Sequence, residues 1–172
     1  AQAVVAGAFG DFPVFVGVEI GTRSGDAVLF APNLDPFLTR EEWREVNGLE
    51  MPSLAEVVAL AERVEGVVLL GHPYDRNRKG APRDRMYVLG GVAGVEIGTD
   101  NADARANRIA LEAVGRSTLP GFGGTARRGA LGAPGWLTLF ASPVRTQADL
   151  VRALRGGDFW AVEVLGRRGG RA

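Results

Sequence analysis

The chain has no cysteine, one histidine and one lysine among its 172 residues. The absence of cysteine excludes disulfides, thiol nucleophiles and cysteine-based zinc sites, so any metal ion must be held by histidine and carboxylate side chains. The single histidine, His72, makes that supply of ligands small. No apolar run approaches the ~20 residues of a membrane span, and no signal-peptide pattern opens the chain. We therefore expect a cytoplasmic protein with no membrane partner.

The charge is balanced, with 20 basic and 20 acidic residues and a formal net charge of zero. A basic surplus is what holds nucleic acid through counterion release, so we expect no nucleic-acid binding by bulk charge. Hydrophobic residues make up 46% of the chain and charged residues 23%, which is typical of a globular domain. We expect one domain over 1–166, followed by a basic, glycine-rich tail over 167–172. Glycine, at 25 residues, has roughly twice its usual share.

Short apolar segments bounded by glycine or proline predict most of the secondary structure. Capping-box patterns begin at Thr39 and Ser53 and each predicts a helix start, and Thr146-Gln-Ala-Asp149 predicts a further one. Another helix is expected over 102–114. The predicted strands cover 14–20, 25–31, 67–71, 94–97, 136–140 and 159–165, with a short extended piece at 117–122. Nearly continuous apolar strands favour a parallel sheet with helices outside it, and both a doubly wound sheet and part of a barrel fit this pattern.

Glu19 and His72 each lie at the end of an otherwise apolar strand, where parallel sheets and barrels place their sites. An imidazole there can bind a metal ion through one nitrogen while its other nitrogen is oriented by a hydrogen bond. The tetrapeptide Gly-Val-Glu-Ile at 17–20 recurs at 94–97, which makes Glu96 a second candidate inward carboxylate. The structural alternatives are a solvated or arginine-paired Glu19 and a hydrogen-bonded, purely structural His72.

Two long loops, over 74–85 and 121–135, are candidates for function. Their basic side chains could form an anion-binding rim, because arginine binds phosphate through two parallel hydrogen bonds; the alternative is a solvated loop with scattered charge. The glycine-rich stretch at 121–124 has neither P-loop nor GxGxxG spacing, so it is weak support for nucleotide binding. The basic residues are Arg76, Arg78, Lys79, Arg83, Arg85, Arg127 and Arg128.

In their order and spacing, these segments resemble the polymerase and histidinol phosphatase (PHP) family of metal-dependent phosphoesterases. Residues 16–20 are similar to the family's Gly-x-Glu strand, and residues 71–73 to its Ala-His-Pro motif. Residues 94–107 are similar to a Val-Glu-x-x-Asn stretch followed by a helix that bears Asn, and residues 119–156 to the family's closing segment. The similarity covers nearly the whole chain.

The resemblance implies a PHP-like (TIM-like) distorted β/α barrel of which this chain holds a part, with the amino-terminal part missing. It implies hydrolysis of phosphate esters by metal-activated water, with a divalent metal (zinc, manganese or iron) as cofactor and a phosphorylated small molecule or nucleotide as partner. Glu19 and His72 are then metal ligands. Arg76, Lys79 and Arg128 are the candidate phosphate-binding residues.

The chain departs from the family pattern where the family has Ser-Asp-x-His. Here the sequence is Thr125-Ala126-Arg127-Arg128, and the family's amino-terminal His-x-His segment is absent. An alternative is therefore a non-catalytic PHP-like module that holds no metal and binds phosphate through Arg128. A third interpretation is a barrel fragment with no independent function. An incomplete barrel exposes a sheet edge, so it would pair with another copy into a homo-oligomer.

Overall fold

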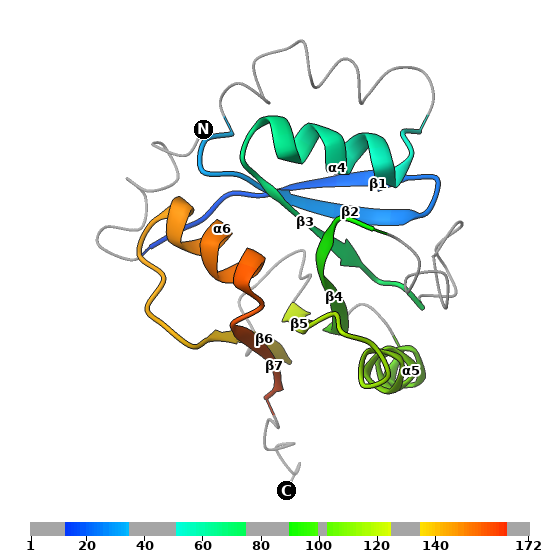
Figure 1. Cartoon of the computed structure of the whole chain (residues 1–172). Helices are drawn as coiled ribbons and strands as arrows, with labels where there is room; N and C mark the ends of the chain where they lie inside the picture. The colour runs from blue at the N-terminus through cyan, green and yellow to red at the C-terminus, as the bar shows by residue number, and fades with distance from the viewer. Residues whose placement is uncertain (1–12, 35–50, 75–89, 100–102, 125–134, 165–172) are drawn as a thin grey trace, which may run out of the picture.

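The structure, a computed structural model, describes residues 13–34, 51–74, 90–99, 103–124 and 135–164. The predicted helix start at Thr39 and the tail over 167–172 lie outside these ranges. Within them, no helix is both long and apolar enough to cross a bilayer. In chain order the elements are β1 (Val18–Thr22), β2 (Gly25–Phe30), α4 (Leu54–Arg63), β3 (Val67–Gly71), β4 (Val92–Thr99), α5 (Ala104–Val114), β5 (Gly121–Gly124), β6 (Trp136–Phe140), α6 (Gln147–Gly156) and β7 (Phe159–Glu163) (Figure 1).

Five of the strands form one open sheet in the order β1-β2-β3-β4-β5. The pairs β1–β2 and β2–β3 are antiparallel, whereas β3–β4 and β4–β5 are parallel. β6 and β7 pair with each other, antiparallel, in a second sheet. The protein is therefore a mixed α/β fold with two sheets.

The prediction of a PHP-like distorted β/α barrel is wrong. The described strands form no closed barrel, and their mixed directions are incompatible with the all-parallel strands of such a barrel. Only Arg23 and Ser24 separate β1 from β2, and a connection this short joins antiparallel neighbours, because parallel strands need a crossover of a dozen or more residues. The apolar character of β1 and β2 reflects burial and does not report strand direction.

Helices cover both faces of the sheet at β3, where all five residues are buried. Alternate residues of a strand point to opposite faces. Val68 and Leu70 join the core cluster that contains residues of α4 and α5, whereas Val67 and Leu69 join the cluster that contains residues of α6. This two-sided burial explains why the sequence of β3 is continuously apolar and why its predicted bounds, 67–71, are confirmed.

The second sheet attaches to the first through β4 and β5. A Cβ atom at Gly98 would overlap the indole ring of Trp136, so β6 can approach β4 only because residue 98 has no side chain. The Thr138 hydroxyl donates a hydrogen bond to the carbonyl of Gly123 at 2.7 Å and accepts one from its N–H at 3.1 Å. The second sheet is therefore held against β5 by packing and by a side chain, without a continuous ladder.

Capping boxes begin both α4 and α6, as their sequences predict. The backbone N–H and the hydroxyl of Ser53 both donate hydrogen bonds to the Glu56 carboxylate. These bonds lower the pKa of that carboxyl below its ordinary value of 4.5, and the bond from the backbone N–H has the larger effect. At α6, hydrogen bonds from the Thr146 hydroxyl and then from the Arg145 N–H hold the pKa of Asp149 below 3.8. Both carboxylates satisfy amide groups that a helix start otherwise leaves unpaired.

These two carboxylates make part of the stability depend on pH. Their pKa values are lower in the folded than in the unfolded chain, so their contribution is complete above the ordinary values and is lost as the pH falls through the folded-state values. We expect the double variant Glu56→Gln/Asp149→Asn to be less stable than the wild type near pH 7, and the difference to shrink by about pH 3. Urea unfolding followed by circular dichroism measures this difference in the free energy of unfolding. A difference that stays constant between the two pH values contradicts the lowered pKa values of the two carboxyls.

Candidate functional site

His72 follows the last residue of β3, and its backbone is in the left-handed region with φ of 44°. Residues that precede a proline favour extended backbone, and Pro73 follows here, so this conformation is strained for a residue with a side chain. The side chain is 11% exposed. Strain of this kind persists only where the surroundings fix it, and the contacts of His72 show how.

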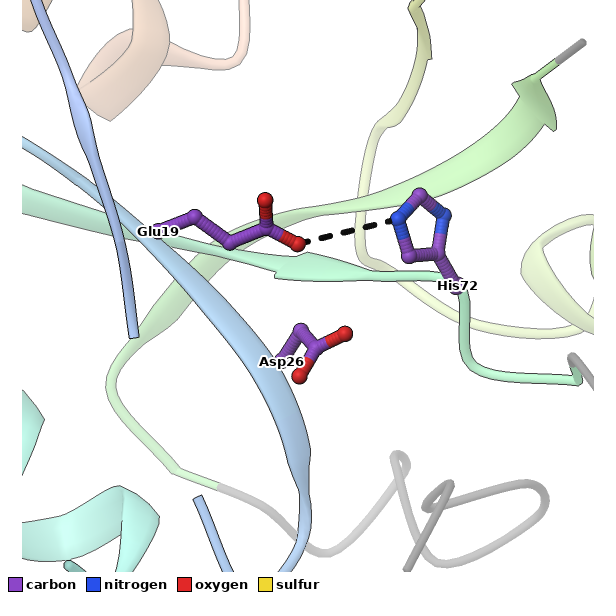
Figure 2. Close-up of side chains that lie close together, drawn as sticks. All are labelled: Glu19, Asp26 and His72. Carbon is purple, nitrogen blue, oxygen red and sulfur yellow. Dashed lines mark ion pairs between the residues drawn. The ribbon is translucent and has the colours of Figure 1, made fainter. Parts of the chain in front are cut away.

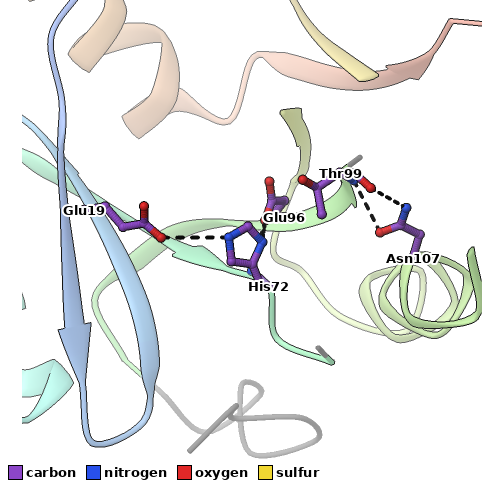
Figure 3. Close-up of polar contacts among 5 residues, drawn as sticks. All are labelled: Glu19, His72, Glu96, Thr99 and Asn107. Atoms are coloured by element: carbon purple, nitrogen blue, oxygen red, sulfur yellow. Dashed lines mark hydrogen bonds and ion pairs between the residues drawn. The ribbon is translucent and has the colours of Figure 1, made fainter. Parts of the chain in front are cut away.

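Glu96, in the middle of β4, contacts His72 at two atoms (Figure 3). Its Oε2 atom accepts a hydrogen bond from the backbone N–H of His72 at 3.0 Å. The same oxygen lies against Nδ1 of the imidazole. The Glu96 side chain is 8% exposed, so this is a buried carboxylate whose partner is the only histidine of the chain.

Glu19 reaches the other side of the ring from β1. Its Oε1 atom lies 3.8 Å from Nε2 of His72, and its side chain is 54% exposed (Figure 2). The structure thus brings together the two residues for which the sequence predicts metal-ligand roles. Glu19 is in β1 and His72 follows β3, and these two strands are not neighbours, since β2 lies between them in the sheet.

Asp26 completes the cluster and was not predicted from the sequence. In the sheet, Gly21 of β1 and Gly71 of β3 lie directly opposite Asp26 on either side. Opposed residues share a face, and residues two apart on a strand also share one, so Asp26 lies on the same face as Glu19. The sequence signal that could have identified Asp26 is a hairpin over 18–30 closed at Arg23 and Ser24. In that hairpin, residues 19 and 26 are diagonal neighbours on one face of the two strands.

The three side chains could hold a metal ion. One ligand atom from each of Glu19, Asp26 and His72 lies within 4.8 Å of the others. The donor set is one imidazole nitrogen and carboxylate oxygens, which suits divalent cations of borderline or hard character. Glu96 contacts the ring nitrogen that points away from this cluster, an arrangement found behind metal-binding histidines. The residues present therefore fit a metal ion.

Asn107 has a different role from the cluster. Its side chain donates to the carbonyl of Thr99 at 2.9 Å and accepts from the Thr99 N–H at 3.3 Å, which ties α5 to the end of β4 (Figure 3). The predicted phosphate-binding residues Arg76, Lys79 and Arg128 lie outside the described residues. So do Arg78, Arg83, Arg85 and Arg127, and their roles stay predictions.

Fold and cluster together define a mixed α/β protein with a candidate metal site where β1, β2 and β3 meet. No family model matches the chain, and no curated protein matches it in sequence. Among solved structures the fold is similar to the crystal structure of PsfC from Pseudomonas syringae PB-5123, with a TM-score of 0.65 at 14% sequence identity. The similarity covers 88% of this chain and 59% of the PsfC chain. At this identity the likeness concerns the fold alone.

Glu19 and His72 differ in burial, so we expect their substitution to affect stability differently. Glu19→Gln alters a half-exposed side chain, so we expect the free energy of unfolding of the metal-free protein to change by less than about 0.5 kcal/mol. His72→Ala removes the partner of the buried Glu96 carboxylate and should cost on the order of 3 kcal/mol. Urea unfolding of the two variants checks both values; a large loss in Glu19→Gln would make Glu19 a structural residue.

Proposed function

We propose that this chain is a metal-dependent phosphoesterase that holds a divalent cation at Glu19, Asp26 and His72 and hydrolyses phosphate esters. The observation that carries the proposal is the convergence of these three side chains within 4.8 Å. The Glu96 carboxylate behind the imidazole adds support, because metal-binding histidines commonly have such a partner on the ring nitrogen that faces away from the metal.

The donor set favours zinc, manganese or iron as the cation. Catalytic sites of such metals commonly use three protein ligands from histidine and carboxylate side chains and leave at least one position open. Magnesium and calcium are bound mainly by oxygen atoms, so an imidazole ligand argues against them. The absence of cysteine removes the thiolate ligands that would otherwise compete for a soft metal.

When bound, a divalent cation would lower the pKa of a water molecule and withdraw negative charge from a phosphoryl oxygen. The chain's own residues have separate tasks. Glu19 is half-exposed, so its carboxylate lies on the solvent side of the cluster. His72, at 11% exposure, fixes the inner side of the site. Gly21 and Gly71 lie directly opposite Asp26 on its two sides, so neither of these two positions adds a side chain beside its carboxylate.

The substrate class comes from the resemblance to the PHP motifs at residues 16–20 and 71–73. Those motifs supply the two residues, Glu19 and His72, whose side chains approach to 3.8 Å. A phosphorylated small molecule or a nucleotide is the proposed substrate. The balanced charge argues against a long nucleic acid, which would require a basic surface.

Metal binding and hydrolysis can be tested separately in one set of variants. We expect the wild type to bind Mn²⁺ or Zn²⁺ in calorimetric titration, and Glu19→Gln and Asp26→Asn each to weaken that binding on the order of 10–100-fold or more. Glu112→Gln, which alters an exposed carboxylate on α5, is the matched control and should bind as the wild type does. Hydrolysis of p-nitrophenyl phosphate should require the metal and fall in the same two variants.

Each outcome separates the alternatives. Equal metal binding in the wild type and both cluster variants contradicts the site. Metal binding without hydrolysis of any phosphate ester contradicts the phosphoesterase and supports a non-catalytic metal-binding module. No metal binding, together with phosphate binding that Arg128→Ala abolishes, supports the metal-free phosphate-binding alternative.

A further inference from the structure

We infer that Glu96 is a positioning residue that keeps a proton on Nδ1 of His72 and so presents the Nε2 lone pair to the cluster formed with Glu19 and Asp26. The inference deepens the proposed function and rests on it for its purpose, since a lone pair at Nε2 is what a cation needs. The orientation of the ring can nevertheless be tested without any metal.

The proton assignment follows from the donors and acceptors in contact. An ionised carboxylate accepts hydrogen bonds and cannot donate them, so the contact of Glu96 Oε2 with Nδ1 favours the form of the ring that carries its hydrogen on Nδ1. A neutral imidazole has one N–H, so Nε2 is then the acceptor. Nε2 is the nitrogen that lies 3.8 Å from Glu19, on the side of the metal-ligating cluster.

The backbone of His72 is fixed by the same oxygen atom. Oε2 of Glu96 accepts from the His72 N–H at 3.0 Å while it contacts Nδ1. Two contacts from one residue set both the left-handed backbone and the ring plane, which a contact to the ring alone would not do. These contacts therefore restrain both the strained backbone of His72, with its φ of 44°, and the position of its ring.

The carboxylate of Glu96 is itself confined. A Cβ atom at Gly124 of β5 would lie 3.0 Å from Oε1, so the parallel strand that pairs with β4 closes the space beside that oxygen. The side chain is 8% exposed, so little room is left toward solvent. Glycine at position 124 leaves the space that the carboxylate occupies while it contacts His72.

Nitrogen NMR of the imidazole tests this directly, because His72 is the only histidine and its signals need no assignment. In the wild type, under alkaline conditions at which the ring is neutral, we expect the Nδ1–H form to dominate, whereas a free imidazole side chain favours Nε2–H. In Glu96→Ala the ring should revert to Nε2–H. Glu96→Gln keeps the volume with a weaker acceptor and should give an intermediate population if the alanine variant does not fold.

The control separates positioning from a structural role. Thr138→Val removes the two hydrogen bonds to Gly123 and should lower the melting temperature without changing the nitrogen shifts of His72. A wild-type ring in the Nε2–H form overturns the inference, and so does an unchanged Nδ1–H population in the variants of Glu96.

Zinc titration distinguishes this inference from the proposed function. We expect Glu96→Gln to weaken zinc binding about 10–100-fold although Glu96 is not a ligand. Zinc binding equal to that of the wild type refutes the positioning role and leaves the metal site standing. A wild type that binds no zinc but shows the Nδ1–H form refutes the proposed function and supports the ring orientation.

Discussion

The contact between the buried carboxylate of Glu96 and His72 is the interaction on which the site depends. Without it, the imidazole would sit at a strand end on a strained backbone with no fixed direction. With it, Nδ1 of the ring contacts Glu96 of β4, and Nε2 is turned toward Glu19 of β1 and Asp26 of β2. Parallel pairing of β3 with β4 makes the contact, because it brings the end of one strand beside the middle of the next.

The site is also a consequence of the mixed sheet. An antiparallel hairpin supplies two carboxylates close together, Glu19 and Asp26, from residues seven apart in the sequence. The parallel pair supplies the imidazole and its supporting carboxylate from residues 24 apart. A sheet of one strand direction would need a long crossover connection between each two successive strands of these four. The hairpin thus replaces part of what a barrel would provide, and the chain can assemble the cluster without closing one.

Much of the local structure could be predicted from the sequence, and the sheet could not. The strand at 67–71 and the capping boxes at Ser53 and Thr146 depend on short-range patterns, and the structure confirms them. The prediction of a barrel was wrong because an apolar strand sequence indicates burial and not strand direction. The two-residue turn at Arg23 and Ser24 is the feature that indicates an antiparallel pair. Glu19 and His72 were predicted from the sequence as strand-end residues with metal-ligating side chains; His72 does follow the end of β3, whereas Glu19 is the second residue of β1. Asp26 was missed because its place depends on the register of a hairpin, and the role of Glu96 depends on a contact between distant residues.

The most direct test of the central claim is the position of a metal ion in crystals soaked with Mn²⁺ or Zn²⁺, located by anomalous diffraction at the absorption edge of that metal. The account predicts a peak within bonding distance of Nε2 of His72 and of carboxylate oxygens of Glu19 and Asp26, with Glu96 still on Nδ1. A peak bound elsewhere, or a fully soaked crystal whose cluster shows none, would contradict it.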